Sequence, residues 1–283
     1  MGIFSRRNKD DDSAAWHNKG NSLADLKRYE EAIGCYDKAI RINPESWVTW
    51  VAKGLSLLIL ERYEEAIGCY DEAIRLNPEK SDAWNNKGIS LDKLERYEEA
   101  IGCYDKAIRL NPETYNVRVN KGRILAELGQ HEEAIECYDK AIRIDPENYD
   151  AWHNKGSSLA RLERQEEAIR CYNEATKLNP EDYGTWNNKG YSLTELKRYE
   201  EAVECYDKAI RLNPENYNAW NNKGNSLVKL ERHEEAIGCL DEAIRLNPED
   251  YDAWYNKGTA LAKLQRYEEA IGCFAKAKEL DES

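Results

Sequence analysis

Cysteine is the residue type in this 283-residue chain with the most varied chemistry, because thiols form disulfides, bind metals and act as nucleophiles. The chain has eight of them: Cys35, Cys69, Cys103, Cys137, Cys171, Cys205, Cys239 and Cys273. Every interval between them is 34 residues, whereas metal-binding cysteines typically come in closely spaced pairs. The regular interval indicates one structural position that recurs along the chain. It does not indicate a metal site or a disulfide framework.

The histidines offer no catalytic arrangement either. His131 and His233 stand where most other copies of the 34-residue period have Tyr, and His17 and His153 have no partner motif. The chain contains no nucleophile elbow, no phosphate-binding loop and no zinc-ligand spacing. We therefore predict no catalytic residue, no metal and no cofactor, and we expect a protein that is not an enzyme.

Other residues recur at the same interval as the cysteines. Trp16, Gly20, Ala32 and Pro44 each begin a series that continues along the chain in steps of 34 residues. The period defines eight repeats, which we number in chain order: 13–46, 47–80, 81–114, 115–148, 149–182, 183–216, 217–250 and 251–283. Positions within a repeat are called places, and Ser13 is place 1 of repeat 1. Residues 1–12 precede the repeats, and we expect them to form a disordered polar leader.

The repeat resembles the tetratricopeptide repeat family over nearly the whole chain. The family pattern is met in repeat 1 by Trp16, Gly20, Ala32, Tyr36, Ala39 and Pro44, which occupy places 4, 8, 20, 24, 27 and 32. The resemblance implies an all-α fold, an α-solenoid of eight helix-turn-helix repeats. It further implies that they form a right-handed superhelix with a concave groove lined by the first helix of each repeat.

Helical periodicity divides each first helix into two arcs. Places 1, 3, 4, 7, 8, 10, 11 and 14 share one arc and carry Trp, Gly, Ala, Ser and Leu, so this arc should pack. Places 2, 5, 6, 9, 12 and 13 share the other arc, vary between repeats and should face the groove. In the second helix, Cys at place 23 falls on the inward arc. We expect these thiols to be buried, unpaired and structural, as in a reducing cytoplasm.

Charge and composition limit the kinds of partner. The formal net charge is −13, which disfavours nucleic acid because affinity for phosphates depends on Lys and Arg. No apolar run is long enough for a membrane helix, and the first residues lack the apolar core of a secretory signal. We therefore expect a cytoplasmic protein that binds neither nucleic acid nor membrane.

The groove arc carries a recurring amide. Place 6 is Asn in seven repeats: Asn18, Asn86, Asn120, Asn154, Asn188, Asn222 and Asn256. Asn both donates and accepts hydrogen bonds, so a ladder of Asn suits an extended peptide of unspecified sequence. Tyr191 and Arg123, the one basic residue at place 9, share the arc, and Arg123 with Arg118 could meet an acidic group. The family's clamp for a C-terminal carboxylate needs Lys at place 5, which this chain never has.

Repeat 2 departs from the polar groove. Its first helix lies in the stretch WVTWVAKGLSLLIL, residues 47–60, which is apolar on both arcs. On the groove arc, together with neighbours in repeats 3 and 4, it contributes an apolar patch of Val48, Val51, Leu55, Leu58, Ile59, Ile89 and Val119. A helix that is apolar all round is normally covered. The cover could be a partner's helix or peptide, a second copy of this chain, or the leader with its Ile3 and Phe4.

Place 7 is Lys in all eight repeats, although it falls on the packed arc. A Lys stem can lie along apolar surface while its ammonium group reaches a carboxylate. Glu31 and its equivalents at place 19 are the expected partners. We interpret this Lys as structural.

Three functions remain open from the sequence. The favoured one is a non-catalytic scaffold that binds a protein or peptide in the groove, with the apolar patch as anchor and the Asn ladder beside it. The alternative is a self-associating structural protein that uses the patch or the ends of the repeat array. An RNA reader is a third, and the negative charge argues against it.

Overall fold

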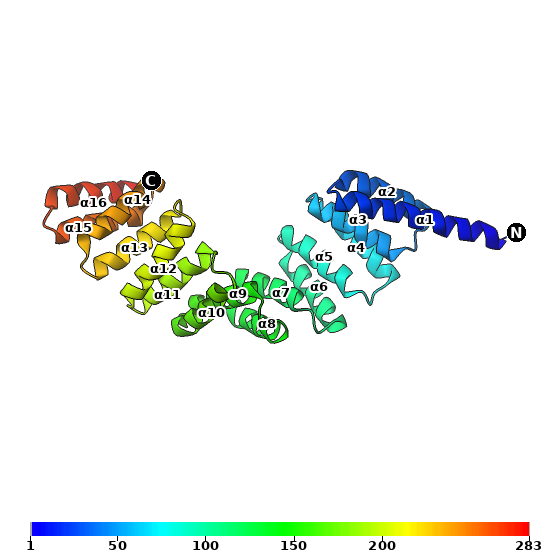
Figure 1. Cartoon of the computed structure of the whole chain (residues 1–283), viewed down its shortest axis with the longest axis horizontal. Coiled ribbons are helices and arrows are strands. Elements are labelled where there is room, and N and C mark those ends of the chain that lie inside the picture. Colours follow the sequence, from blue (N-terminus) through cyan, green and yellow to red (C-terminus); the bar gives the residue numbers. More distant parts are fainter. Residues whose placement is uncertain (1, 283) are drawn as a thin grey trace. The chain divides into compact units, whose positions relative to one another are not determined.

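The computed structural model describes residues 2–282, with side chains from Asp11 onward, and over these residues it contains sixteen α-helices and no strand (Figure 1). The chain divides into two compact bodies at residue 144. The N-terminal body holds α1 (Gly2–Asp25), α2 (Tyr29–Ile42), α3 (Trp47–Ile59), α4 (Tyr63–Leu76), α5 (Ser81–Lys93), α6 (Tyr97–Leu110), α7 (Tyr115–Glu127) and α8 (His131–Ile144). The C-terminal body holds α9 (Tyr149–Arg161), α10 (Gln165–Leu178), α11 (Tyr183–Glu195), α12 (Tyr199–Leu212), α13 (Tyr217–Lys229), α14 (His233–Leu246), α15 (Tyr251–Lys263) and α16 (Tyr267–Asp281). The predicted all-α fold with two helices per repeat is confirmed.

Residues 2–12, the first part of the chain, are continuous with the first helix. Its backbone is helical from Gly2, so residues 2–12 extend α1. No Pro or Gly interrupts residues 3–19, which leaves the helix without a breaker. Met1 and the side chains of Ile3 and Phe4 lie outside the described residues, and so does their suggested contact with the apolar patch.

Each repeat turns between its two helices at place 15. This residue has positive φ in every repeat, for example 60° at Lys27 and 77° at Gly129. In repeat 1 the Arg28 amide donates to the Leu23 carbonyl at 2.9 Å, and the Lys27 amide donates to the Ala24 carbonyl at 2.8 Å. These two bonds form a Schellman motif, which ends the first helix and sets the direction of the second.

The core of a repeat is a glycine facing an aromatic ring. The Tyr side chains at place 24 in repeats 1 to 6 are completely buried. A Cβ atom added at Gly88 would lie 2.7 Å from the Cε1 atom of Tyr104. Glycine is required at place 8 because the helix backbone approaches the ring too closely for any side chain.

The cysteines occupy the interior, as predicted. All eight are free thiols, and seven of them are buried, Cys137 being half-buried. Burial raises the pKa of Cys69 and of Cys205 to about 11. A raised pKa leaves little thiolate, which is the reactive form.

We therefore expect the native protein to resist alkylation. At pH 8 only about a thousandth of a thiol with such a pKa is ionised, so iodoacetamide should label Cys69 and Cys205 at least 100-fold more slowly than after unfolding in urea. Mass spectrometry of timed samples measures both rates. Equal labelling of native and unfolded protein would contradict the burial.

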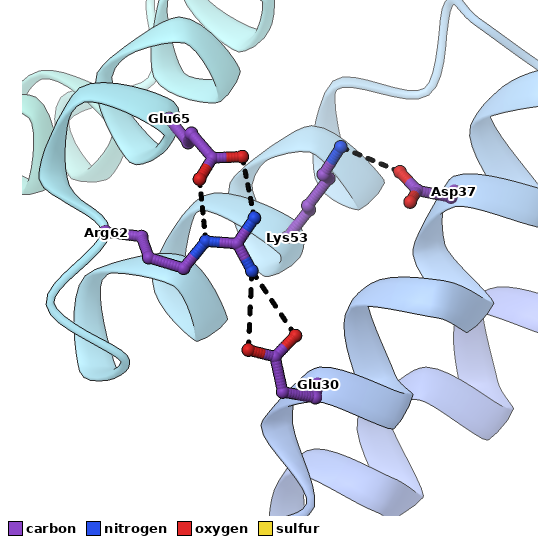
Figure 2. A network of polar contacts seen from close by, with 5 residues as sticks. All are labelled: Glu30, Asp37, Lys53, Arg62 and Glu65. Carbon is purple, nitrogen blue, oxygen red and sulfur yellow. Dashed lines mark hydrogen bonds and ion pairs between the residues drawn. The ribbon is translucent and has the colours of Figure 1, made fainter.

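Consecutive repeats are joined by Lys at place 7 (Figure 2). The carboxylate is the Asp at place 25 of the preceding repeat, and the atoms lie 2.5 to 2.7 Å apart. The pairs are Lys53–Asp37, Lys87–Asp71, Lys121–Asp105, Lys223–Asp207 and Lys257–Asp241. The expected partner at place 19 was wrong, because that Glu is taken by Arg at place 16 of its own repeat, as Glu65 is by Arg62 at 2.6 Å.

Candidate functional site

The apolar patch separates into exposed and packed residues. Val48, Leu55 and Ile59 of α3 are 44%, 44% and 45% exposed. Val51 and Leu58 are half-buried and pack against a core cluster that contains Leu57 and Tyr70. Ile89 and Val119 are also half-buried and pack against core clusters of their own repeats. The surface available to a ligand is therefore mainly the three exposed side chains of α3.

A hollow lies beside these side chains, between α1 and α3. Its volume is about 450 Å³. Ala52, Leu55 and Ile59 line it from α3, while Asn21 and Asp25 line it from α1. At its base the Tyr36 hydroxyl donates to the Asn21 Oδ1 atom at 2.9 Å, so that amide is already oriented. The hollow offers apolar walls with polar groups along one side.

The Asn ladder is partly engaged within the protein. In the C-terminal body the amide of Asn222 donates to Asn187 at 3.5 Å, and the amide of Asn256 donates to Asn221 at 3.2 Å. Each of these bonds joins place 6 of one repeat to place 5 of the repeat before it. Asn18 is exposed, whereas Asn86, Asn120, Asn154 and Asn188 are half-buried. These hydrogen bonds between repeats therefore occupy some of the amide donors and acceptors that we expected to bind a peptide.

Arg123 is not the unpaired basic residue that the sequence suggested. Its guanidinium group bonds to the carboxylate of Asp92, which is buried, and to Glu127 at 2.9 Å. Arg118 donates to the Thr114 carbonyl at 3.3 Å. Asp92 and Arg123 are 31 residues apart, and stacking of α5 beside α7 brings them together. Arg123 is thus a link between repeats.

The histidines of the groove arc form a second kind of link that sequence reasoning missed. His17 Nδ1 lies 3.1 Å from the Thr49 hydroxyl, and His153 Nδ1 lies 2.6 Å from the Thr185 hydroxyl. Among the repeats, Thr occurs at place 3 only in the two repeats that follow a His at place 5. This joint occurrence in the sequence could have been used to predict the two His–Thr contacts.

The second pair also includes Asp182, so the residue types match those of a catalytic triad. Thr185 donates to the Asp182 carboxylate at 2.6 Å, and Tyr149 donates to the same carboxylate at 2.7 Å. Thr185 is completely buried, so no substrate can reach its hydroxyl. Burial lowers the pKa of His153, which keeps the ring neutral near pH 7. The arrangement is a buried hydrogen-bond network between α9 and α11.

Between residues 11 and 282, no three His, Cys, Asp or Glu side chains are grouped so that they could hold a metal ion. None of the helices in that part of the chain is both long and apolar enough to cross a membrane.

Comparison with solved structures finds chains of similar fold. One is YrrB, a TPR protein with an unusual peptide-binding site, with 26% identity and a TM-score of 0.58 over 65% of this chain and 95% of that chain. MamA from Desulfovibrio magneticus RS-1 has 21% identity and a TM-score of 0.57 over 59% and 95% of the two chains. A chain of the APC/C Cut9-Hcn1 hetero-tetramer has 18% identity and a TM-score of 0.59, over 93% of this chain and 52% of that one. No curated protein matches the sequence.

Family models cover most of the repeats. One model described as tetratricopeptide repeat matches residues 51–113, 86–149 and 221–283, and another with the same description matches residues 13–46, 149–182 and 184–216. Over the described residues the sixteen helices form eight pairs, each with a glycine against the place-24 side chain, and this agrees with the matches. The chain therefore belongs to the tetratricopeptide repeat family.

Proposed function

We propose that this protein is a non-catalytic interaction scaffold that binds a peptide at the hollow between α1 and α3. The observation that carries the proposal is the position of Leu55 and Ile59. Both are nearly half exposed, and both line a hollow of about 450 Å³. Ligand pockets typically combine apolar walls with a few polar groups that fix orientation. Asn21 and Asp25 supply those groups here.

The size of the exposed patch favours a peptide over a second copy of the chain. Stable protein interfaces bury about 800 Å² on each partner, and obligate ones bury more. Three half-exposed side chains on one helix supply only a small part of such an area. One apolar side chain of a peptide fits the hollow, and a basic residue beside it would meet the Asp25 carboxylate. The preferred ligand is therefore an apolar residue next to Lys or Arg.

The Asn residues at place 6 have a supporting role in this proposal. In the N-terminal body, Asn18, Asn86 and Asn120 lie on the first helices of repeats 1, 3 and 4, and Ala52 stands at place 6 of repeat 2. An extended peptide backbone would meet Asn18 on one side of the hollow, and Asn86 and Asn120 on the other. Asn154, Asn188, Asn222 and Asn256 repeat the arrangement in the C-terminal body. YrrB, which is 26% identical, is a peptide-binding member of the same fold, and this is consistent with the assignment.

The test is a peptide selection followed by a matched substitution. A displayed library of random peptides is selected on the purified protein, and the dissociation constants of the enriched peptides are measured. Leu55→Asp with Ile59→Asp should weaken them about 100-fold, because each buried apolar side chain contributes roughly 1.5 kcal/mol or more. Leu58 is unsuitable for this purpose, since it packs against the core.

Ile271→Asp is the control, because Ile271 is exposed on α16 of the other body and should leave binding unchanged. Far-UV circular dichroism shows whether each variant remains folded. If the selected peptides bind the double variant as tightly as the wild type, the hollow is not the site. A molar mass that rises with concentration and returns to that of a monomer in the double variant would assign the patch to self-association instead.

A further inference from the structure

Repeat 5 differs from the others at three places on one helix, α10. Place 25 is Asp in six repeats but Asn173 here, and place 28 is Ile in six repeats but Thr176 here. Place 22 is Gly in five repeats and Glu in two, but here it is Arg170. Relative to a repeat with Gly at place 22 and Asp at place 25, Arg170 and Asn173 together make the net charge more positive by two.

All three residues line one cavity inside the C-terminal body. The cavity has a volume of about 650 Å³, within the range of small-molecule sites. Trp152 of α9 and Lys189 of α11 are also among the residues that line it. Thr176 is smaller than Ile, and its hydroxyl donates to the Tyr172 carbonyl at 2.9 Å, so the change widens the cavity without leaving a polar atom unsatisfied.

Lys189 is a place-7 Lys that lacks the usual Asp at place 25 of the preceding repeat. Five of its equivalents are held 2.5 to 2.7 Å from Asp at place 25 of the preceding repeat, for example Lys223 by Asp207. Asn173 occupies that place for Lys189, and no ion pair reaches Lys189 among residues 11–282. Its ammonium group lies 5.1 Å from the centre of the Trp186 ring. Lys189 thus lacks the Asp partner of its equivalents. Glu201 of α12 acts on it electrostatically, but that carboxylate is paired with Arg198 at 2.6 Å.

The acidic residues of the cavity do not compensate for this charge. Glu174 is paired with Lys177 at 2.6 Å, and Glu167 is paired with Arg164 at 2.6 Å. Arg170 also acts electrostatically on Glu167, whose lowered pKa is caused mainly by the hydrogen bond from Arg164. The remaining charge of Lys189 and Arg170 is positive, in a chain whose formal net charge is −13.

We infer that the cavity of repeat 5 binds an oxyanion, a carboxylate or phosphate group, between Lys189 and Arg170. Asn173 replaces a like-charged Asp that would repel the anion, and its amide adds a hydrogen-bond donor. Charge-assisted bonds from Lys and Arg to an oxyanion are the strong ones. The site uses residues of α9, α10 and α11, so it is separate from the hollow between α1 and α3 and does not depend on the proposed function.

Isothermal titration calorimetry of the full chain with inorganic phosphate and, separately, with glutarate tests the inference. Asn173→Asp restores the residue of the other repeats and the ion pair with Lys189. It should fold and should weaken binding at least tenfold. Arg170→Gly likewise restores a repeat residue and should weaken binding severalfold. Asp207→Asn is the control, because it removes the ion-pair partner of Lys223 next to a repeat that has no Arg at place 22. It should not create a second binding site of equal affinity.

Saturable binding of either probe that Asn173→Asp removes supports the site, and the tighter probe identifies whether phosphate or carboxylate is preferred. Weaker binding in added NaCl is also expected, because salt screens the charges. If neither probe binds at concentrations up to about 10 mM, or if Asn173→Asp binds as well as the wild type, the inference is wrong.

Discussion

Gly88→Ala should lower the free energy of unfolding by about 2 kcal/mol, whereas Gly102→Ala in the same repeat should raise it by up to about 1 kcal/mol. Both glycines are inside helices. A Cβ at Gly88 would lie 2.7 Å from the ring of Tyr104, which is completely buried, so the ring or the helix would have to shift. A Cβ at Gly102 meets nothing within 4 Å, so Ala there brings only its better helix propensity.

Urea unfolding followed by circular dichroism at 222 nm measures both changes, the wavelength being the usual one for helices. Repeat proteins can unfold in parts, so the comparison uses the shift of the transition that is shared by the wild type and both variants. The same substitution in the same repeat isolates the effect of the ring. If Gly88→Ala and Gly102→Ala shift the unfolding transition in the same direction, the contact with the Tyr104 ring is not the reason that place 8 is Gly.

Arg123→Ile alone should cost about 3 kcal/mol, and adding Asp92→Leu should recover most of that loss. Removing Arg123 leaves the Asp92 carboxylate buried without its cation. The double variant replaces the ion pair with Leu and Ile, the residues that repeats 2 and 3 already have at the equivalent places as Leu58 and Ile89. Replacing a buried ion pair with packed apolar residues is often neutral or stabilising.

A double-mutant cycle with Asp92→Leu as the second single variant gives the coupling between the two residues. We expect a coupling of more than 1 kcal/mol, since the two side chains bond directly. Additive effects would mean that the pair contributes no more than two separate residues. The cycle also reports on the stacking of α5 beside α7, because the pair is made only when these helices are adjacent.

The local structure of this protein follows from its sequence. The 34-residue period located eight repeats, and the spacing of apolar residues within each gave two helices with a packed arc. Cys at place 23 was assigned to the interior, where seven of the eight thiols are buried. These predictions hold because they depend on neighbours within one repeat, and the helical period alone states which of those residues share a face.

The contacts between repeats were decided only by the tertiary structure. Lys53 bonds to Asp37 and not to a place-19 Glu, Arg123 is bonded to Asp92, and Leu58 packs inward although it stands on the arc that we assigned to the groove. A helical period gives the direction of a side chain on its own helix. It does not give the offset or rotation at which the next repeat stacks. Those two quantities determine which residues 16, 31 or 32 positions apart come within bonding distance.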